Sequence, residues 1–128
     1  MRFMIVVKSA ENASPPPQAL MAAIAKLGEE AMQAGVMVET GGLLPSAMGA
    51  RVRLSAGKQT VTDGPFSETK ELIGGYAIYD LKSKQEAIEW ASRFMGLHKE
   101  HWPGWEGESE IRQIFEAPDF GSGGQKKR

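Results

Sequence analysis

The sequence predicts an α+β fold on the split βαβ pattern, with a β-hairpin inserted between the second and third strands of that pattern. Apolar runs of strand length occur at residues 3–7 and 76–81. Residues 18–34 and 84–95 place apolar side chains three and four positions apart, as one face of a helix does. The resulting order of strand, helix, strand, hairpin, strand, helix and strand is the split βαβ pattern. A chain of 128 residues suits one domain with a single core.

The first strand and the first helix follow from composition and spacing. Residues 3–7 are apolar on both faces and end in β-branched residues, which favours a central strand covered on both sides. A helix should begin around Pro17 or Gln18, because proline is tolerated in the first helical turn. Gly35 should end it. The apolar stripe of this helix consists of Leu20, Ile24, Leu27 and Ala31.

The second strand, residues 36–44, contains Gly41 and Gly42, and paired glycines in a strand indicate a bulge or a close backbone approach. Glu39 is polar in an otherwise apolar strand start. Its side chain either faces solvent at a sheet edge or points into a cleft. Residues 51–54 alternate cleanly and residues 59–61 return after a short turn, which predicts the hairpin.

A turn follows the hairpin at Asp63, Gly64 and Pro65. Aspartate can bond its own backbone in a turn, glycine supplies positive φ, and proline fixes φ and lacks an N–H group. Phe66 comes next, and a large apolar ring in this place needs a pocket or a partner surface. The stretch is either a well-made turn with an aromatic plug or a carboxylate held at the rim of a ligand cleft.

The remaining elements are a strand, a helix and a last strand. Tyr76 begins the strand at residues 76–81, where its hydroxyl is a candidate ligand donor. Ser83 and Glu86 match a capping box for the second helix. The last strand is expected at residues 110–116. The side chains that the second helix should bury are Ala87, Trp90, Ala91 and Phe94.

The connection at residues 96–107 is more aromatic than a plain helix-to-strand link requires. His98 and His101 would share a face of a helical turn, but two histidines without a third ligand at fixed spacing do not define a metal site, and no metal is expected. Trp102 and Trp105 suggest a lid or a dimer contact. His101 is a candidate acid–base group, because histidine titrates near neutral pH.

Several runs of the sequence, taken together, resemble a known family. The runs are Asp63-Gly64-Pro65-Phe66, Glu68-Thr69-Lys70-Glu71 and Gly74-Gly75-Tyr76, with residues 2–7 and 87–91. They resemble the YCII-related family, also called DGPF-domain proteins, and residues 97–107 look like the insertion of a longer branch. The likeness spans residues 1–117, and residues 118–128 are expected to be a disordered tail. The resemblance to this family implies a ferredoxin-like subunit that pairs into a dimeric α+β barrel.

The family resemblance also implies candidate activities. Some relatives are regarded as small-molecule enzymes with a His–Asp pair, and some are encoded near extracytoplasmic-function sigma factors. In this sequence Asp63 matches by motif, whereas no histidine precedes His98. His101 is therefore our own choice of partner for Asp63.

The composition of the chain limits the kinds of partner and the compartment that we expect. The net charge of −1 gives no reason to expect nucleic acid or an anionic membrane, and no cofactor is expected. The chain has no cysteine, which excludes disulfides and thiol catalysis and fits a reducing compartment. No signal-peptide core or spanning segment is recognisable, so a cytoplasmic location is expected.

Three functions compete. The first is small-molecule binding near the Asp63 turn and a dimer seam, the second an acid–base enzyme that uses Asp63 with His101, and the third a sigma-factor-associated or structural partner role. A homodimer is expected in each case, since two helices on one face leave the other face of an apolar sheet uncovered. The candidate site residues are Glu39, Asp63, Gly64, Pro65, Phe66, Lys70, Tyr76, His101 and Trp102.

Overall fold

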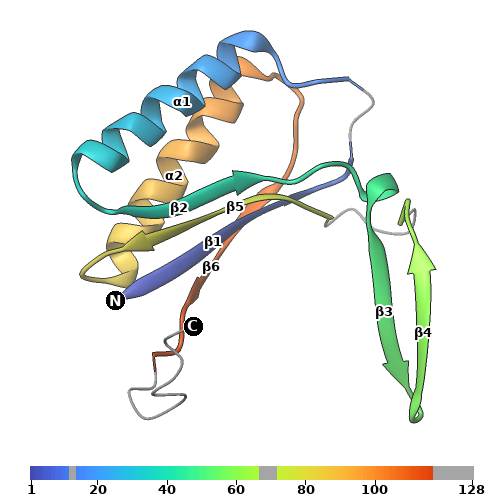
Figure 1. Ribbon diagram of the computed structural model, residues 1–128. Helices are drawn as coiled ribbons and strands as arrows, with labels where there is room; N and C mark the ends of the chain where they lie inside the picture. The colour runs from blue at the N-terminus through green and yellow to red at the C-terminus, as the bar shows by residue number, and fades with distance from the viewer. Residues whose placement is uncertain (12–13, 67–71, 117–128) are drawn as a thin grey trace.

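The computed structural model describes residues 1–11, 14–66 and 72–116, and the predicted α+β class is confirmed in this part of the chain. Figure 1 shows the arrangement of its elements. Lys70 and the predicted boundary between residues 117 and 118 lie outside the described residues. The elements are β1 (Arg2–Ser9), α1 (Gln18–Gln33), β2 (Met37–Gly42), the short 3₁₀ helix η1 (Ser46–Met48), β3 (Ala50–Ser55), β4 (Lys58–Asp63), β5 (Leu72–Asp80), α2 (Lys84–His101) and β6 (Glu108–Gln113).

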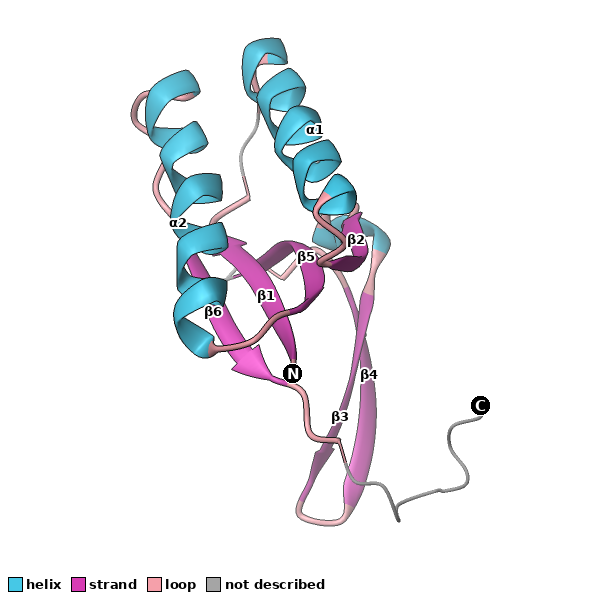
Figure 2. Cartoon of the chain, turned by 90° about the vertical axis from the view of Figure 1, so that its left-hand side faces the viewer, coloured by secondary structure: helices cyan, strands magenta, loops and turns pink. Residues whose placement is uncertain are grey.

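The main sheet has the strand order β2-β5-β1-β6, and each neighbouring pair is antiparallel. Both helices lie on the same face of this sheet (Figures 1 and 2). Phe3 lies opposite Tyr79 in the register of β1 and β5, and both side chains are buried under the helices with Ile5. The rest of this core consists of Ala31, Leu81, Ala87 and Ala91.

Both helices bury the faces that their spacing predicts. In α1, Leu20, Leu27 and Ala31 are buried and Ile24 is half-buried. The Ser83 hydroxyl accepts a hydrogen bond from the Glu86 N–H at 3.2 Å, as a capping box requires. The Glu86 carboxylate, however, accepts from the N–H of Lys82.

Several element ends differ from the prediction. The second helix continues to His101, because burial of His98 against Trp105 outweighs the small helix penalty of Gly96. Strand β5 begins at Leu72, four residues before Tyr76, and β6 spans Glu108–Gln113 instead of residues 110–116. The irregularity in β2 lies between Met37 and Glu39 and not at the paired glycines.

The second face of the main sheet is apolar at its centre. Because neighbouring side chains on a strand alternate between faces, Met4, Val6, Tyr76 and Ile78 point away from Phe3 and the helices. These four residues are only half-buried. No helix of the described chain covers this face (Figure 2). This is the face through which the sequence predicts that two copies pair.

The predicted hairpin forms as a separate two-stranded sheet of β3 and β4. Ala56 and Gly57 at its tip have φ values of 53° and 76°, the positive values that a two-residue hairpin turn needs. The hairpin leaves the body on the side opposite the helices (Figures 1 and 2). Neither α1 nor α2 carries an apolar stretch that could span a lipid bilayer.

Candidate functional site

The predicted turn follows β4 and is held by close backbone contacts. Asp63 is the last residue of the strand, and the peptide bond between Gly64 and Pro65 is cis. A Cβ atom at Gly64 would lie 1.7 Å from the carbonyl oxygen of Ser46, which no side chain can tolerate. The Gly64 N–H also donates to the carbonyl of Gly49 at 2.9 Å. The prediction of a positive φ at Gly64 was wrong, because the glycine is required by a close approach instead.

Ser46 joins this turn to Glu11, which lies far from it in the sequence. Its hydroxyl oxygen accepts a hydrogen bond from the Phe66 N–H at 3.1 Å. The same hydroxyl donates to the Glu11 carboxylate at 3.0 Å, and the Ser46 N–H donates to the other oxygen of that carboxylate. Sequence reasoning missed both Glu11 and Ser46, since only the fold brings these two residues, 35 positions apart, into contact.

Phe66 is half-buried, and the guanidinium carbon of Arg51 lies 3.9 Å from the centre of its ring. This is the geometry of a cation–π contact. The stacking of Arg51 on Phe66 connects the hairpin to the turn.

A cleft of about 550 Å³ opens beside Phe66, in the range typical of small-molecule sites. Most of its lining is apolar, and Glu11, Ser46 and Arg51 are its side chains that carry polar groups. Phe66 is the predicted site residue that lines it within the described chain, while Gly64 fixes the adjoining turn. The apolar lining includes Leu43, Leu44, Pro45, Met48, Leu72 and Ile73.

Two other predicted site residues are in direct contact. The Tyr76 hydroxyl donates to the Glu39 carboxylate at 2.7 Å. This hydrogen bond raises the pKa of Tyr76, because it holds the phenol proton beside a negative charge. A Cβ at Gly41 would lie 2.9 Å from the Tyr76 ring, so the close approach predicted for the paired glycines is confirmed at Gly41.

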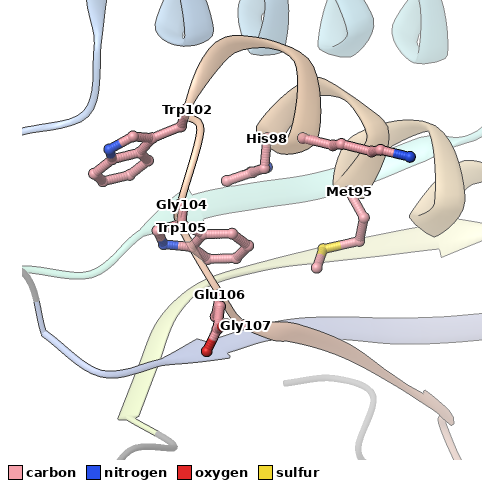
Figure 3. Close-up of a pocket in the computed structure, with 8 residues that line it drawn as sticks. Met95, His98, Trp102, Gly104, Trp105, Glu106 and Gly107 are labelled. Atoms are coloured by element: carbon pink, nitrogen blue, oxygen red, sulfur yellow. The ribbon is translucent and has the colours of Figure 1, made fainter.

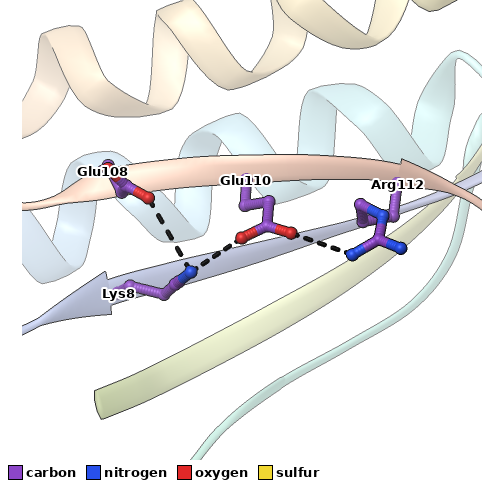
Figure 4. Close-up of polar contacts among 4 residues, drawn as sticks. All are labelled: Lys8, Glu108, Glu110 and Arg112. Atoms are coloured by element: carbon purple, nitrogen blue, oxygen red, sulfur yellow. Dashed lines mark hydrogen bonds and ion pairs between the residues drawn. The ribbon is translucent and has the colours of Figure 1, made fainter. Parts of the chain in front are cut away.

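A row of charged side chains lies on the same helix-free face (Figure 4). The Lys8 ammonium lies 2.7 Å from one oxygen of Glu110, and the Arg112 guanidinium lies 3.1 Å from the other. Lys8 is also 3.8 Å from Glu108. The two hydrogen bonds lower the pKa of Glu110. Charged groups therefore border the apolar centre of this face on the β6 side.

The two residues of the proposed acid–base pair lie at the ends of different elements. Asp63 is exposed at the end of β4, and His101 is half-buried at the end of α2, where its Nε2 lies 3.9 Å from Glu100. Among residues 1–11, 14–66 and 72–116, no hydrogen bond or ion pair joins Asp63 to His101. Their pairing stays a prediction.

The aromatic segment after α2 packs around His98 (Figure 3). This histidine is buried, its Nδ1 donates to the Phe94 carbonyl at 3.1 Å, and its ring centre lies 4.3 Å from that of Trp105. Trp102 stacks at 6.2 Å from Trp105 beside a hollow of about 370 Å³. In the described chain no three potential metal ligands of the His, Cys, Asp and Glu types come together.

These features define a small α+β protein with one antiparallel four-stranded sheet, two helices on one face and a glycine-dependent turn beside a cleft. The family model of the YCII-related domain matches residues 1–95, and the chain belongs to this family. The match includes the turn at residues 63–66 but not residues 97–107, so membership of a longer branch stays a prediction.

The chain is also similar to an uncharacterized protein of Rhizobium meliloti (strain 1021). The two are 40% identical over 60 residues, which cover 47% of this chain and 48% of that protein. The chain therefore matches about half the length of this relative.

Proposed function

We propose that the protein binds a small molecule in the cleft beside the turn at residues 63–66. The observation that carries the proposal is the construction of the cleft wall. Gly64 is packed against Ser46, Ser46 is bonded to Phe66 and Glu11, and Arg51 stacks on the Phe66 ring. A wall fixed from three directions is preorganised for a ligand, which reduces the entropy lost on binding.

The cleft lining indicates the chemistry of the ligand. Its walls are mostly apolar, with few polar side chains at Glu11, Ser46 and Arg51. We therefore expect a compact molecule with an apolar or planar part that packs beside Phe66, and with one or two polar groups that set its orientation.

We further propose that the subunit is ferredoxin-like and pairs, sheet face to sheet face, into a two-fold α+β barrel. Two observations support this proposal. The strand order β2-β5-β1-β6 with both helices on one face is the arrangement such a subunit needs. Met4, Val6, Tyr76 and Ile78 are left half-buried on the helix-free face, where a second copy would cover them.

A thermal-shift screen with a library of small metabolites tests the binding proposal. We expect at least one compound to raise the Tm of the wild type and to lose most of this effect in Phe66→Ala. A compound at about a hundred times its Kd stabilises a protein by about 2.7 kcal/mol, which a melting curve resolves.

Phe115→Ala is the matched control, because Phe115 is 83% exposed and lies outside the cleft. It should respond to the compound as the wild type does. Equal shifts in all three proteins would place the site elsewhere, and a library that stabilises none of them would count against small-molecule binding.

A further inference from the structure

The two faces of the β3–β4 hairpin differ in chemistry. The register places Val52 opposite Val61, with Leu54 on the same face. Val52 is 65% exposed, Val61 is 70% exposed and Leu54 is 71% exposed. The other face carries Arg51, Arg53 and Lys58. The hairpin thus presents one apolar face and one cationic face.

An uncovered hairpin of this kind needs a partner surface. A single two-stranded hairpin is marginally stable in water, and three large apolar side chains side by side on its surface add a further penalty. On the cationic face Arg51 stacks on Phe66, and the exposed Arg53 and Lys58 carry charges that favour contact with water, so the apolar face is the one that gains from being covered.

The apolar face of the hairpin does not stand alone. Leu44 and Met48, near the base of the hairpin, are 73% and 72% exposed. Leu43 and Ile73 are also exposed and line the cleft with them. The lining of the proposed ligand cleft thus contributes exposed apolar side chains of its own near the base of the hairpin.

The direction and length of the hairpin identify the occupant. The hairpin leaves the body on the side opposite the helices, which is the side of the uncovered sheet face (Figures 1 and 2). Each strand has six residues, or about 20 Å at ~3.4 Å per residue, whereas sheets packed face to face are ~10 Å apart. An arm of this length reaches beyond the seam of a sheet-to-sheet dimer.

We propose that the hairpin is an arm whose apolar face, formed by Val52, Leu54 and Val61, binds the body of a second copy of this chain. This inference rests on the proposed sheet-to-sheet dimer. Two-fold symmetry makes the contact reciprocal, so each copy holds the other. Asp63 lies on the apolar side at the base of the arm, opposite Ala50. The second copy would cover this exposed carboxylate and form an outer wall for the cleft.

Thiol labelling tests the arm directly, because the chain has no cysteine of its own. Val61→Cys places one thiol on the apolar face, and Thr60→Cys places one on the opposite face at the neighbouring position. Both positions are exposed in the single chain. We expect a thiol reagent to react about tenfold more slowly with Val61→Cys at protein concentrations where two copies pair than in dilute solution, because a second copy would cover that thiol. The rate for Thr60→Cys should stay the same, and comparing each variant with itself removes the effect of the cations beside position 60 on thiol reactivity. A Val61→Cys rate that is the same at all protein concentrations would overturn the proposal.

Charge substitutions give an independent measurement by analytical ultracentrifugation. Val61→Lys should raise the dimer dissociation constant by at least about tenfold, while Thr60→Lys, which adds the same charge and also replaces a β-branched residue, should leave it unchanged. Met4→Lys tests the sheet seam instead. If Met4→Lys dissociates the dimer and Val61→Lys does not, the seam stands and the arm is wrong. A wild type that stays monomeric at all concentrations overturns both, without bearing on the thermal-shift result.

Discussion

The substitution Gly64→Ala tests the central contact of the candidate site. The added Cβ would lie 1.7 Å from the carbonyl oxygen of Ser46 and 2.6 Å from its carbonyl carbon. Both are backbone atoms, so no side-chain rotation relieves the clash. Overpacking usually costs about 1–3 kcal/mol, and the upper part of this range applies here because the turn or η1 must shift.

Urea unfolding of the wild type, Gly64→Ala and Gly42→Ala measures the effect. A Cβ at Gly42 meets no atom within 4 Å, so this variant controls for the loss of a glycine near the same cleft. We expect Gly64→Ala to lose about 2–3 kcal/mol of unfolding free energy and Gly42→Ala to change by less than about 1 kcal/mol. A Gly64→Ala protein as stable as Gly42→Ala would refute the packing argument.

Two further predictions concern ionisation on the helix-free face. Spectroscopic titration should show Tyr76 losing its proton at a higher pH than a free tyrosine. Glu39→Gln should lower the pKa of Tyr76 again, since the hydrogen bond to the Glu39 carboxylate is the main cause of the raised pKa. An unchanged Tyr76 pKa in Glu39→Gln would contradict this explanation. Lys8 and Arg112 lower the pKa of Glu110, so its ionised form stabilises the fold above the ordinary pKa that glutamate has in the unfolded chain, and this contribution is lost as the pH falls through the lower folded-state pKa. Urea unfolding of Glu110→Gln should therefore show a weaker loss of stability on acidification than the wild type, and identical pH profiles would argue against the pair.

The sequence predicted the elements of the fold because their patterns are local. The apolar stripe of α1, the alternation in the hairpin and the cap at Ser83 each involve neighbouring residues. The ends of the helices and strands were predicted less accurately. Gly96 lies inside α2 because the helix continues to bury His98 against Trp105, and that contact depends on the fold around it.

The site was only partly predictable for the same reason. The role of Gly41 followed from its place in a strand, whereas the role of Gly64 depended on Ser46, which a turn pattern does not reveal. No sequence pattern marked Glu11 as a site residue, because a single glutamate in a loop is usually a solvent-exposed side chain, and its bond to Ser46 depends on the fold. Sequence patterns thus located the turn but not the residues that support it.

The proposed ligand cleft and the proposed hairpin arm depend on the same contacts at Gly64. The bond between the Gly64 N–H and the Gly49 carbonyl closes the base of the hairpin, and the contact between Gly64 and Ser46 fixes the wall of the cleft. Any shift at Gly64 therefore changes the direction of the arm and the shape of the cleft together. If the arm binds a second copy, Gly64→Ala should weaken dimer formation as well as ligand binding, whereas Phe66→Ala should weaken ligand binding alone. Comparing the two variants therefore separates the effect of the turn's backbone packing at Gly64 from the effect of the Phe66 ring in the cleft.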